Sequence, residues 1–151
     1  MRKQLLVLVG PTGSGKTPIS LLLASSLDGE IISADSRQIY RYMNIGTAKS
    51  EAAVLSQTKH FFVDEINPNE DFNAGEYSRK SREVVADILG RGKTPIVVGG
   101  SGLYVRALVD GLFEGPGADA ALRKKLYQRL RDEGKEALYG ELSRVDPSSA
   151  M

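Results

Sequence analysis

The stretch that decides the fold reads Leu5-Leu6-Val7-Leu8-Val9-Gly10-Pro11-Thr12-Gly13-Ser14-Gly15-Lys16-Thr17. Residues 5–9 are an apolar run of the kind that forms a buried strand. Residues 10–17 match the pattern G-x-x-x-x-G-K-S/T, and a helical periodicity follows them. A strand, this loop and a helix in that order predict a phosphate-binding loop, without saying which polyphosphate it holds.

The residue types of this loop suit the binding of anionic oxygens. Its glycines allow successive backbone N–H groups to turn toward a phosphate, and the N-terminus of the following helix adds a favourable dipole. We expect Lys16 to neutralise the terminal phosphate and the Thr17 hydroxyl to ligate Mg²⁺. The alternative is a glycine-rich turn that holds no ligand.

Strand and helix patterns alternate through the first part of the chain. Residues 30–33, 60–64 and 95–98 are short apolar runs bounded by turn-forming residues. Apolar residues recur at helical spacing between these runs, at Ile19, Leu22, Leu23 and Leu27, and at Tyr77, Val84, Val85, Ile88 and Leu89. Asn73 followed by Glu76 predicts a capping box at the start of the second helix. The alternation predicts an α/β fold, a P-loop-type parallel sheet flanked by helices, with ligands beyond the carboxyl ends of the strands.

Two further segments follow predicted strands and are expected at the same crevice. Asp35 comes directly after the second strand, where it could hold Mg²⁺ or accept a proton; alternatively it caps a following helix together with Ser36. The run Gly99-Gly100-Ser101-Gly102 follows the fourth strand and could present N–H groups and the Ser101 hydroxyl. The alternative for this run is a plain turn that starts a helix.

The pattern of alternating strands and helices ends after Leu112. A turn-rich link at residues 114–117 precedes a purely helical pattern, marked first by Leu122, Leu126 and Leu130 and then by Ala137, Leu138 and Leu142. We therefore predict an α/β core at residues 1–114 and the start of a helical region at residues 115–151. Residues 118–135 contain six basic and three acidic residues, which indicates either a nucleic-acid surface or a solvated helix face.

Composition excludes several classes of protein. The chain has 151 residues, a formal net charge of +1 and no cysteine, so disulfides and thiolate metal sites are excluded, and bulk charge does not indicate a nucleic-acid binder. No stretch approaches the length of a membrane span, and the first apolar run is too short for a signal peptide. We expect a cytoplasmic protein, and nothing in the sequence indicates an obligate protein partner.

Five blocks of the sequence, taken together, resemble the tRNA dimethylallyltransferase family in content, order and spacing. They are residues 10–17, 34–40, 45–49, 60–64 and 99–104, and residues 145–147 are also similar to that family. The runs Asp-Ser-Arg-Gln-Ile-Tyr and Ile-Gly-Thr-Ala-Lys within these blocks are far more specific than the phosphate-binding loop. The resemblance covers nearly all 151 residues.

The resemblance implies a prenyl transfer. In that family the loop holds the diphosphate of dimethylallyl diphosphate and does not hydrolyse ATP. The N6 atom of the adenosine 3′ to the anticodon attacks the allylic carbon, and diphosphate leaves. Charge on the leaving diphosphate would be stabilised by Lys16, by loop N–H groups and by Mg²⁺ on Thr17.

The resemblance also implies roles for individual residues. Asp35 would accept the N6 proton, and Lys16 and Ser101 would complete the catalytic set. The implied diphosphate-binding residues are Gly10, Pro11, Thr12, Gly13, Ser14, Gly15, Lys16 and Thr17. The implied contacts with the flipped-out nucleotide and the anticodon stem-loop are Asp35, Ser36, Arg37, Gln38, Ser101 and Arg123.

Three departures from the family pattern keep other functions open. Ser101 stands where the family usually has Thr, Ser50 stands where Pro is common, and the family's enzymes are roughly twice as long, with a diphosphate-binding arginine beyond the part that matches. A phosphate-loop kinase, a non-catalytic phosphate-binding domain and a prenyltransferase acting on free adenine nucleotides are the alternatives.

Overall fold

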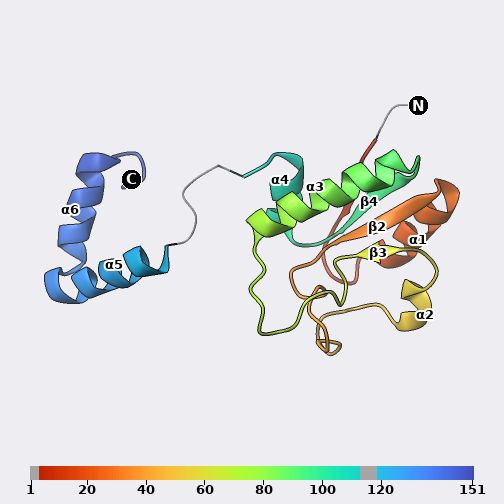
Figure 1. The fold of residues 1–151 in the computed structure, drawn as a ribbon, viewed down its shortest axis with the longest axis horizontal. Coiled ribbons are helices and arrows are strands. Elements are labelled where there is room, and N and C mark those ends of the chain that lie inside the picture. Colours follow the sequence, from red (N-terminus) through yellow and green to blue (C-terminus); the bar gives the residue numbers. More distant parts are fainter. Residues whose placement is uncertain (1–3, 113–118) are drawn as a thin grey trace. The chain divides into compact units, whose positions relative to one another are not determined.

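Four parallel strands form one sheet in the order β1-β4-β2-β3 (Figure 1). The computed structural model describes residues 4–112 and 119–151, so the link expected at residues 114–117 lies outside the described residues. The strands are β1 (Leu6–Val9), β2 (Gly29–Ala34), β3 (His60–Phe61) and β4 (Thr94–Gly99). The parallel α/β sheet predicted from the sequence is therefore confirmed.

Strand β3 is shorter than the apolar run that predicted it. The run extends over residues 60–64, but only His60 and Phe61 pair with β2. Phe62 and Asp64 have φ angles of 61° and 55°, in the left-handed region, which turns the backbone out of the extended conformation. The expected five-residue strand was wrong for this reason.

The carboxyl ends of three strands meet at Gly99. This residue pairs with Val9 of β1 on one side and with Ala34 of β2 on the other. A Cβ atom on Gly99 would collide with the carbonyl group of Ala34, so a glycine is required for this close approach. The segments that follow β1, β2 and β4 therefore leave the sheet at one edge.

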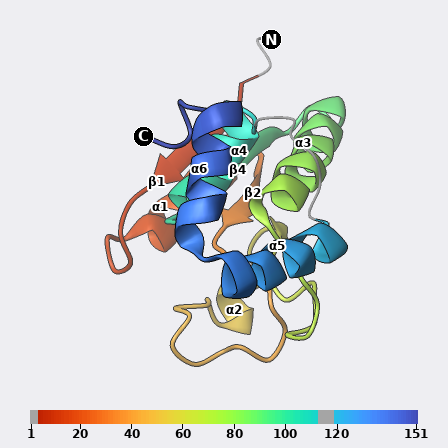
Figure 2. The same cartoon turned by 90° about the vertical axis from the view of Figure 1, so that its left-hand side faces the viewer.

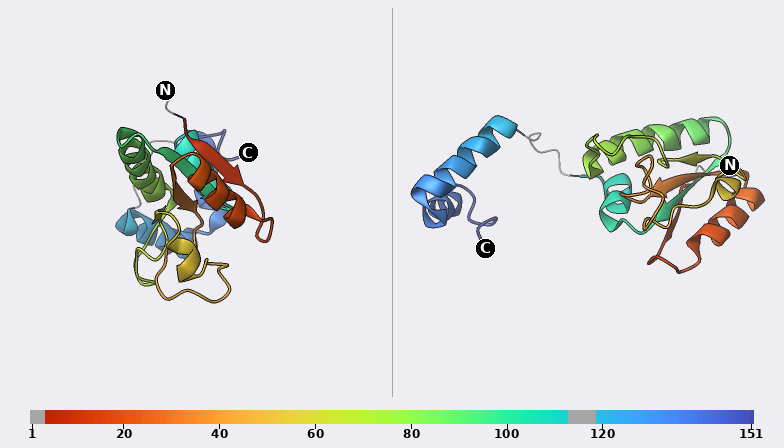
Figure 3. Two further views of the ribbon diagram at one scale, coloured as in Figure 1. Left: turned by 90° about the vertical axis from the view of Figure 1, so that its right-hand side faces the viewer. Right: turned by 90° about the horizontal axis from the view of Figure 1, so that it is seen from below.

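Helices cover both faces of the sheet. Helix α1 (Lys16–Ser26) lies on one face, and α3 (Ala74–Gly90) and α4 (Gly102–Val109) lie together on the other (Figure 3). The core follows the alternation of the strands, with Ile31 and Ile96 in the cluster next to α1 and with Ile32 and Val97 in the larger cluster next to α3 and α4. Burial on both faces is typical of a parallel sheet.

The buried face of α1 differs from the apolar stripe in its sequence. Ser20 and Ala24 are buried, whereas Ile19, Leu22 and Leu27 are 45%, 69% and 44% exposed. Leu21 and Leu23 are partly buried against the same cluster as Ala24. The apolar periodicity at Ile19, Leu22 and Leu27 therefore indicates the helix but does not mark its buried face.

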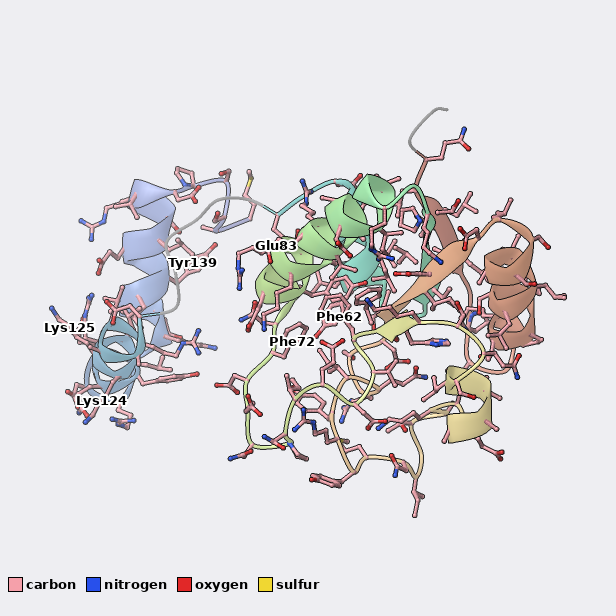
Figure 4. The ribbon with its side chains drawn as sticks, turned by 45° about the vertical axis from the view of Figure 1, so that its right-hand side comes forward. Phe62, Phe72, Glu83, Lys124, Lys125 and Tyr139 are labelled. Carbon is pink, nitrogen blue, oxygen red and sulfur yellow. The ribbon has the colours of Figure 1, made fainter. Side chains whose placement is uncertain are left out.

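Helix α3 begins where the sequence predicts. The Asn73 side chain accepts a hydrogen bond from the Glu76 N–H group at 3.0 Å, which satisfies one of the unpaired donors of the first turn. The Glu76 carboxylate pairs with Lys80 at 3.0 Å. Tyr77 of α3 is completely buried and stacks on Tyr104 of α4, with ring centroids 4.4 Å apart. Phe62 and Phe72 extend this aromatic cluster (Figure 4).

An ion pair between a buried glutamate and an exposed arginine lies at the other end of the sheet. Glu30 of β2 is 4% exposed and accepts two hydrogen bonds from Arg91, which follows α3, at 2.6 and 2.5 Å. These hydrogen bonds hold the pKa of Glu30 below its ordinary value despite its burial. Arg91 thereby joins the end of α3 to the start of β2.

Residues 119–151 form a separate pair of helices, α5 (Ala120–Glu133) and α6 (Lys135–Val145), shown in Figure 2. The Asp119 side chain caps α5 by accepting a hydrogen bond from Leu122 N–H at 2.9 Å. Leu122, Leu126 and Leu130, whose spacing predicted the helix, remain 53%, 42% and 39% exposed, so the apolar face that they form is not buried within this unit. Two short helices alone offer too little surface to bury such a face.

Within residues 4–112 and 119–151, each helix is too short or too polar to cross a bilayer.

We predict that Gly99→Ala lowers the free energy of unfolding of this chain by about 1–3 kcal/mol, because the added methyl group forces the β2 and β4 backbones apart. Gly90→Ala is the matched control, since no atom lies within 4 Å of a Cβ atom there, and it should stabilise α3 by about 0.5–1 kcal/mol. Urea unfolding of both variants measures the difference. A Gly99→Ala protein as stable as the parent would contradict the close approach.

Candidate functional site

The loop at residues 10–17 closes tightly between β1 and α1. Gly13 and Gly15 both have a φ angle of 81°, which side chains rarely allow, and Gly15 is the N-cap residue of α1. A Cβ atom on Gly10 would meet the Ser14 hydroxyl oxygen at 2.9 Å. The loop thus leads directly into the N-terminus of α1, whose N–H groups and dipole favour an anion.

Lys16 lies within the loop that it completes. Its ammonium group donates hydrogen bonds to the carbonyl oxygens of Gly10 at 2.8 Å and of Pro11 at 2.7 Å. An ammonium group has three protons, so these two bonds leave one for a ligand. Lys16 therefore lies against its own loop with one proton unused, and its contact with a terminal phosphate stays a prediction.

A cavity of about 380 Å³ brings the phosphate-binding loop together with the turn that follows β2, with Ala48 and with the carboxyl end of β4. The residues that line it are Thr12, Gly13, Gly15, Lys16, Thr17, Pro18, Asp35, Gln38, Ala48, Val98 and Gly99. Among the predicted site residues in the same unit, Gly10, Pro11, Ser14, Ser36, Arg37 and Ser101 do not line it. The cavity is large enough for a small ligand, and its walls come from four separate segments.

Asp35 forms a turn and no helix follows it. Its Oδ1 atom accepts hydrogen bonds from the N–H groups of Arg37 at 2.8 Å and Gln38 at 3.3 Å. The alternative considered from the sequence, a helix cap, is therefore replaced by an aspartate turn that fixes the carboxylate. Oδ2 takes no part in these two bonds, and it is available to accept a proton or to bind a cation.

Gln38 joins the two most specific blocks of the sequence. Its amide nitrogen donates to the carbonyl oxygens of Thr47 at 3.3 Å and Ala48 at 3.2 Å. Because both partners are acceptors, the nitrogen must face them, and the oxygen atom Oε1 is the group that remains for a ligand. The Thr47 hydroxyl donates to the Met43 carbonyl at 2.7 Å, which closes the loop that carries Ala48.

Ser101 connects the turn after β4 to the turn after β2. Its hydroxyl oxygen accepts a hydrogen bond from Ser36 N–H at 3.0 Å, and its own N–H group donates to the Ala34 carbonyl at 3.1 Å. The hydroxyl proton is still available for another acceptor. The glycine-rich run at residues 99–102 therefore leads into helix α4 and also holds the segment that contains Asp35 by hydrogen bonds.

Tyr104 of α4 belongs to the buried aromatic cluster. Burial raises its pKa, and the charges of Tyr40 and Asp35 add to the effect. The Tyr104 hydroxyl donates to the Phe72 carbonyl at 3.5 Å. The phenol therefore stays protonated at neutral pH and bonds to the segment that precedes α3.

The chemistry of the cavity fits Mg²⁺ held partly by a ligand. The Thr17 hydroxyl and the Asp35 carboxylate, both hard oxygen donors, line the same space. Within residues 4–112 and 119–151, no cluster of three or more His, Cys, Asp or Glu residues could hold a metal ion. Mg²⁺ commonly uses one or two protein ligands with phosphate oxygens and water, and these two residues match that pattern.

Arg123 belongs to the second unit and lies on one stripe of α5. A hollow of about 430 Å³ is lined by Ala120, Arg123, Lys124, Tyr127 and Arg131. Arg129 differs from these residues because it pairs with Glu133 at 2.8 Å and Glu141 at 2.7 Å. Lys124 and Lys125 project from α5 in Figure 4. The basic segment is therefore divided into a basic and aromatic stripe and an arginine engaged in ion pairs.

Four contributors to the site were missed from the sequence. Pro18, Ala48 and Val98 line the cavity, and Lys49, which follows Ala48, pairs with Asp64 at 2.6 Å. The only signal for Ala48 and Lys49 was a position inside the specific Ile-Gly-Thr-Ala-Lys block, which carried no assigned role.

The fold and the site define a phosphate-loop α/β protein whose cavity joins an anion-binding loop to a carboxylate and an amide. Residues 38–151 match the model of the IPP transferase family, and the chain belongs to that family. A tRNA dimethylallyltransferase 2 of Syntrophus aciditrophicus is 48% identical over 149 residues, which are 99% of this chain and 48% of the relative. The chain thus spans about half the length of the curated relatives it matches.

Solved structures agree with this assignment. The full-length tRNA isopentenylpyrophosphate transferase of Bacillus halodurans superposes with a TM-score of 0.73 at 39% identity, covering 99% of this chain and 50% of that one. A eukaryotic dimethylallyltransferase acting on tRNA gives a TM-score of 0.80 at 29% identity, covering 99% of this chain and 37% of that one.

We predict that Ser101→Ala leaves Ser36 N–H without its acceptor, so the amides of residues 35–38 exchange hydrogen faster, by about 5–10-fold if one hydrogen bond is worth about 1 kcal/mol. Ser101→Thr retains the hydroxyl and should exchange at the parent rate. Hydrogen exchange followed by mass spectrometry makes the comparison. Equal exchange in all three proteins would show that the bond contributes nothing.

Proposed function

We propose that the full-length protein transfers a dimethylallyl group from dimethylallyl diphosphate to N6 of the adenosine 3′ to the anticodon in tRNA. The observation that carries this proposal is the single cavity of about 380 Å³ in which Lys16 and Thr17 meet Asp35 and Gln38. The names of the relatives, tRNA dimethylallyltransferases, support it. A kinase would use the same loop, but nothing about the other cavity walls favours that alternative.

The phosphate-binding loop forms the diphosphate end of the cavity. The remaining Lys16 proton, the loop N–H groups and the N-terminus of α1 all face an anion there. These groups bind the diphosphate and stabilise the charge that develops as it leaves. Mg²⁺, held by Thr17 with Asp35 nearby, would supply further charge stabilisation when it is bound.

Asp35 and Gln38 form the nucleophile end. As the new bond from N6 to the allylic carbon forms, the bond from that carbon to the diphosphate oxygen breaks. The proton lost from N6 passes to Oδ2 of Asp35, whose Oδ1 is fixed by the turn. Gln38 offers the acceptor Oε1, while Ser36 and Arg37 lie beside it to contact the nucleotide. Ser101 supports this end through Ser36.

The stripe of α5 is the proposed contact with the anticodon stem-loop. Arg123, Lys124 and Arg131 present positive charge along one side of the helix, with Tyr127 among them. Such side chains bind phosphates in a salt-dependent manner and do not select sequence. A tRNA substrate also supports a cytoplasmic location for the protein.

We predict that the full-length protein transfers the prenyl group to tRNA without turning over ATP. Asp35→Asn should keep diphosphate affinity but reduce the transfer rate by about 10²–10⁴-fold, since a positioned base typically contributes that much. Lys16→Ala should weaken diphosphate binding as well as the rate. Single-turnover transfer with labelled dimethylallyl diphosphate, together with calorimetry of diphosphate binding, separates the two effects. ATP hydrolysis stimulated by a metabolite would contradict the proposed function. Full activity in Asp35→Asn would show that Asp35 is not the base.

We predict that Arg123→Ala in the full-length protein weakens tRNA binding and reduces the slope of log affinity against log salt by about 1. Lys135→Ala is the matched control, because Lys135 is a highly exposed basic residue at the start of α6 that does not line the hollow. Its slope should remain close to that of the parent. Filter binding at several salt concentrations measures both variants, and an unchanged slope in Arg123→Ala would assign tRNA recognition to other residues.

A further inference from the structure

We propose that Lys49 is a positioning residue that holds the Gln38 and Ala48 wall of the cavity and does not itself bind a ligand. A lysine next to a residue that lines the same cavity as a phosphate-binding loop would ordinarily be assigned to an anion. The hydrogen bonds of Lys49 indicate a different role. The expected effect of Lys49 on transfer activity rests on the proposed function, whereas its expected effect on the structure of the cavity wall does not.

The ammonium group of Lys49 has no proton left for a ligand. Its side chain is 4% exposed, and it donates to the Tyr40 carbonyl at 2.8 Å, to Asn44 Oδ1 at 3.1 Å and to Asp64 Oδ1 at 2.6 Å. Three protons therefore meet three acceptors. Lys16, by contrast, uses two of its three protons within the protein. A buried charge needs such complete pairing, and here the pairing is internal.

The three acceptors of Lys49 come from the stretch between Asp35 and Ala48, both of which line the cavity, and from the segment after β3. Tyr40 ends the turn that begins at Asp35, Asn44 lies in the loop that leads to Ala48, and Asp64 follows β3. Backbone bonds strengthen the same junction, since Asp64 N–H donates to the Gln38 carbonyl at 3.1 Å. Lys49 is therefore the charged centre at which these segments join.

Backbone strain concentrates at this junction. Among the described residues, five that are not glycine have a positive φ, and four of them are Tyr42 (64°), Ala48 (50°), Phe62 (61°) and Asp64 (55°). Each such conformation is strained and persists only where its surroundings enforce it. Ala48 lines the cavity and directly precedes Lys49. The three bonds of Lys49 are thus positioned to maintain the strained wall.

Loss of Lys49 should affect one end of the cavity and leave the other intact. The turn at Asp35 and the Gln38–Ala48 contact depend on the junction. The phosphate-binding loop is closed by its own contacts, from Lys16 to Gly10 and Pro11. A misplaced base and nucleotide would slow transfer, because a displacement of about 1 Å can cost about 10²-fold in rate.

The test uses Lys49→Met in the full-length protein with Mg²⁺. We expect the affinity for inorganic diphosphate to stay within about twofold of the parent, kcat for transfer to fall by about 10–100-fold, and amide exchange to increase at residues 38–48 and 62–66. Lys16→Ala should give the opposite pattern, with weak diphosphate binding and unchanged exchange at residues 38–48. Lys93→Met is the matched control, because Lys93 also pairs with an aspartate, Asp28, at 2.8 Å but lies at the start of β4, away from the cavity.

Each outcome decides the role of Lys49. Loss of diphosphate affinity in Lys49→Met as large as that in Lys16→Ala would make Lys49 a ligand-binding residue and overturn the proposal. Unchanged kcat with unchanged exchange would also overturn it. If Lys49→Met does not fold, Asn44→Ala removes a single bond, and it should show the same pattern at smaller size; no change in exchange would count against the proposal. If the parent protein shows no transfer, the proposed function fails, while diphosphate affinity and exchange still test Lys49.

Discussion

The close approach of β1, β2 and β4 at their carboxyl ends determines where every segment of the candidate site begins. Gly99 allows it, because any side chain there would meet the Ala34 carbonyl, and a Cβ atom on the adjacent Gly100 would already lie 3.3 Å from the Gly10 carbonyl. The phosphate-binding loop, the Asp35 turn and the Ser101 turn consequently leave the sheet side by side. A ligand that spans an anion site and a base needs this convergence.

Within the cavity, the site residues divide by the hydrogen-bonding capacity that the protein leaves unused. Lys16 has one proton beyond its two loop bonds, and Asp35 has one oxygen beyond its turn. Gln38 has its amide oxygen beyond the bonds of its nitrogen. Lys49 has no unused donor, although it lies within the specific Ile-Gly-Thr-Ala-Lys block. Unused capacity therefore distinguishes groups that face a ligand from groups that hold the site.

The helical unit at residues 119–151 depends on different physics. No residue of α5 or α6 is buried, and the order of these helices comes from local features such as the Asp119 cap and the Arg129 ion pairs with Glu133 and Glu141. The leucines of this unit are exposed enough to pack against another apolar surface, and its basic stripe is exposed enough to bind a polyanion. Charge that is already paired, as at Arg129, contributes little to such an interaction.

The sequence by itself determined the features that depend on neighbouring residues. Glycine spacing in residues 10–17 defines the loop, alternation of apolar runs defines the parallel sheet, and Asn73 three residues before Glu76 defines the start of α3. Tertiary structure alone decided which face of α1 is buried and where β3 ends, because both depend on how closely other segments approach. It also decided that Ser101 accepts a hydrogen bond from Ser36, 65 residues away, and that Lys49 donates one to Asp64, 15 residues away. Such pairings leave no periodic pattern in the chain, since they arise only when the folded backbone brings a donor to an acceptor.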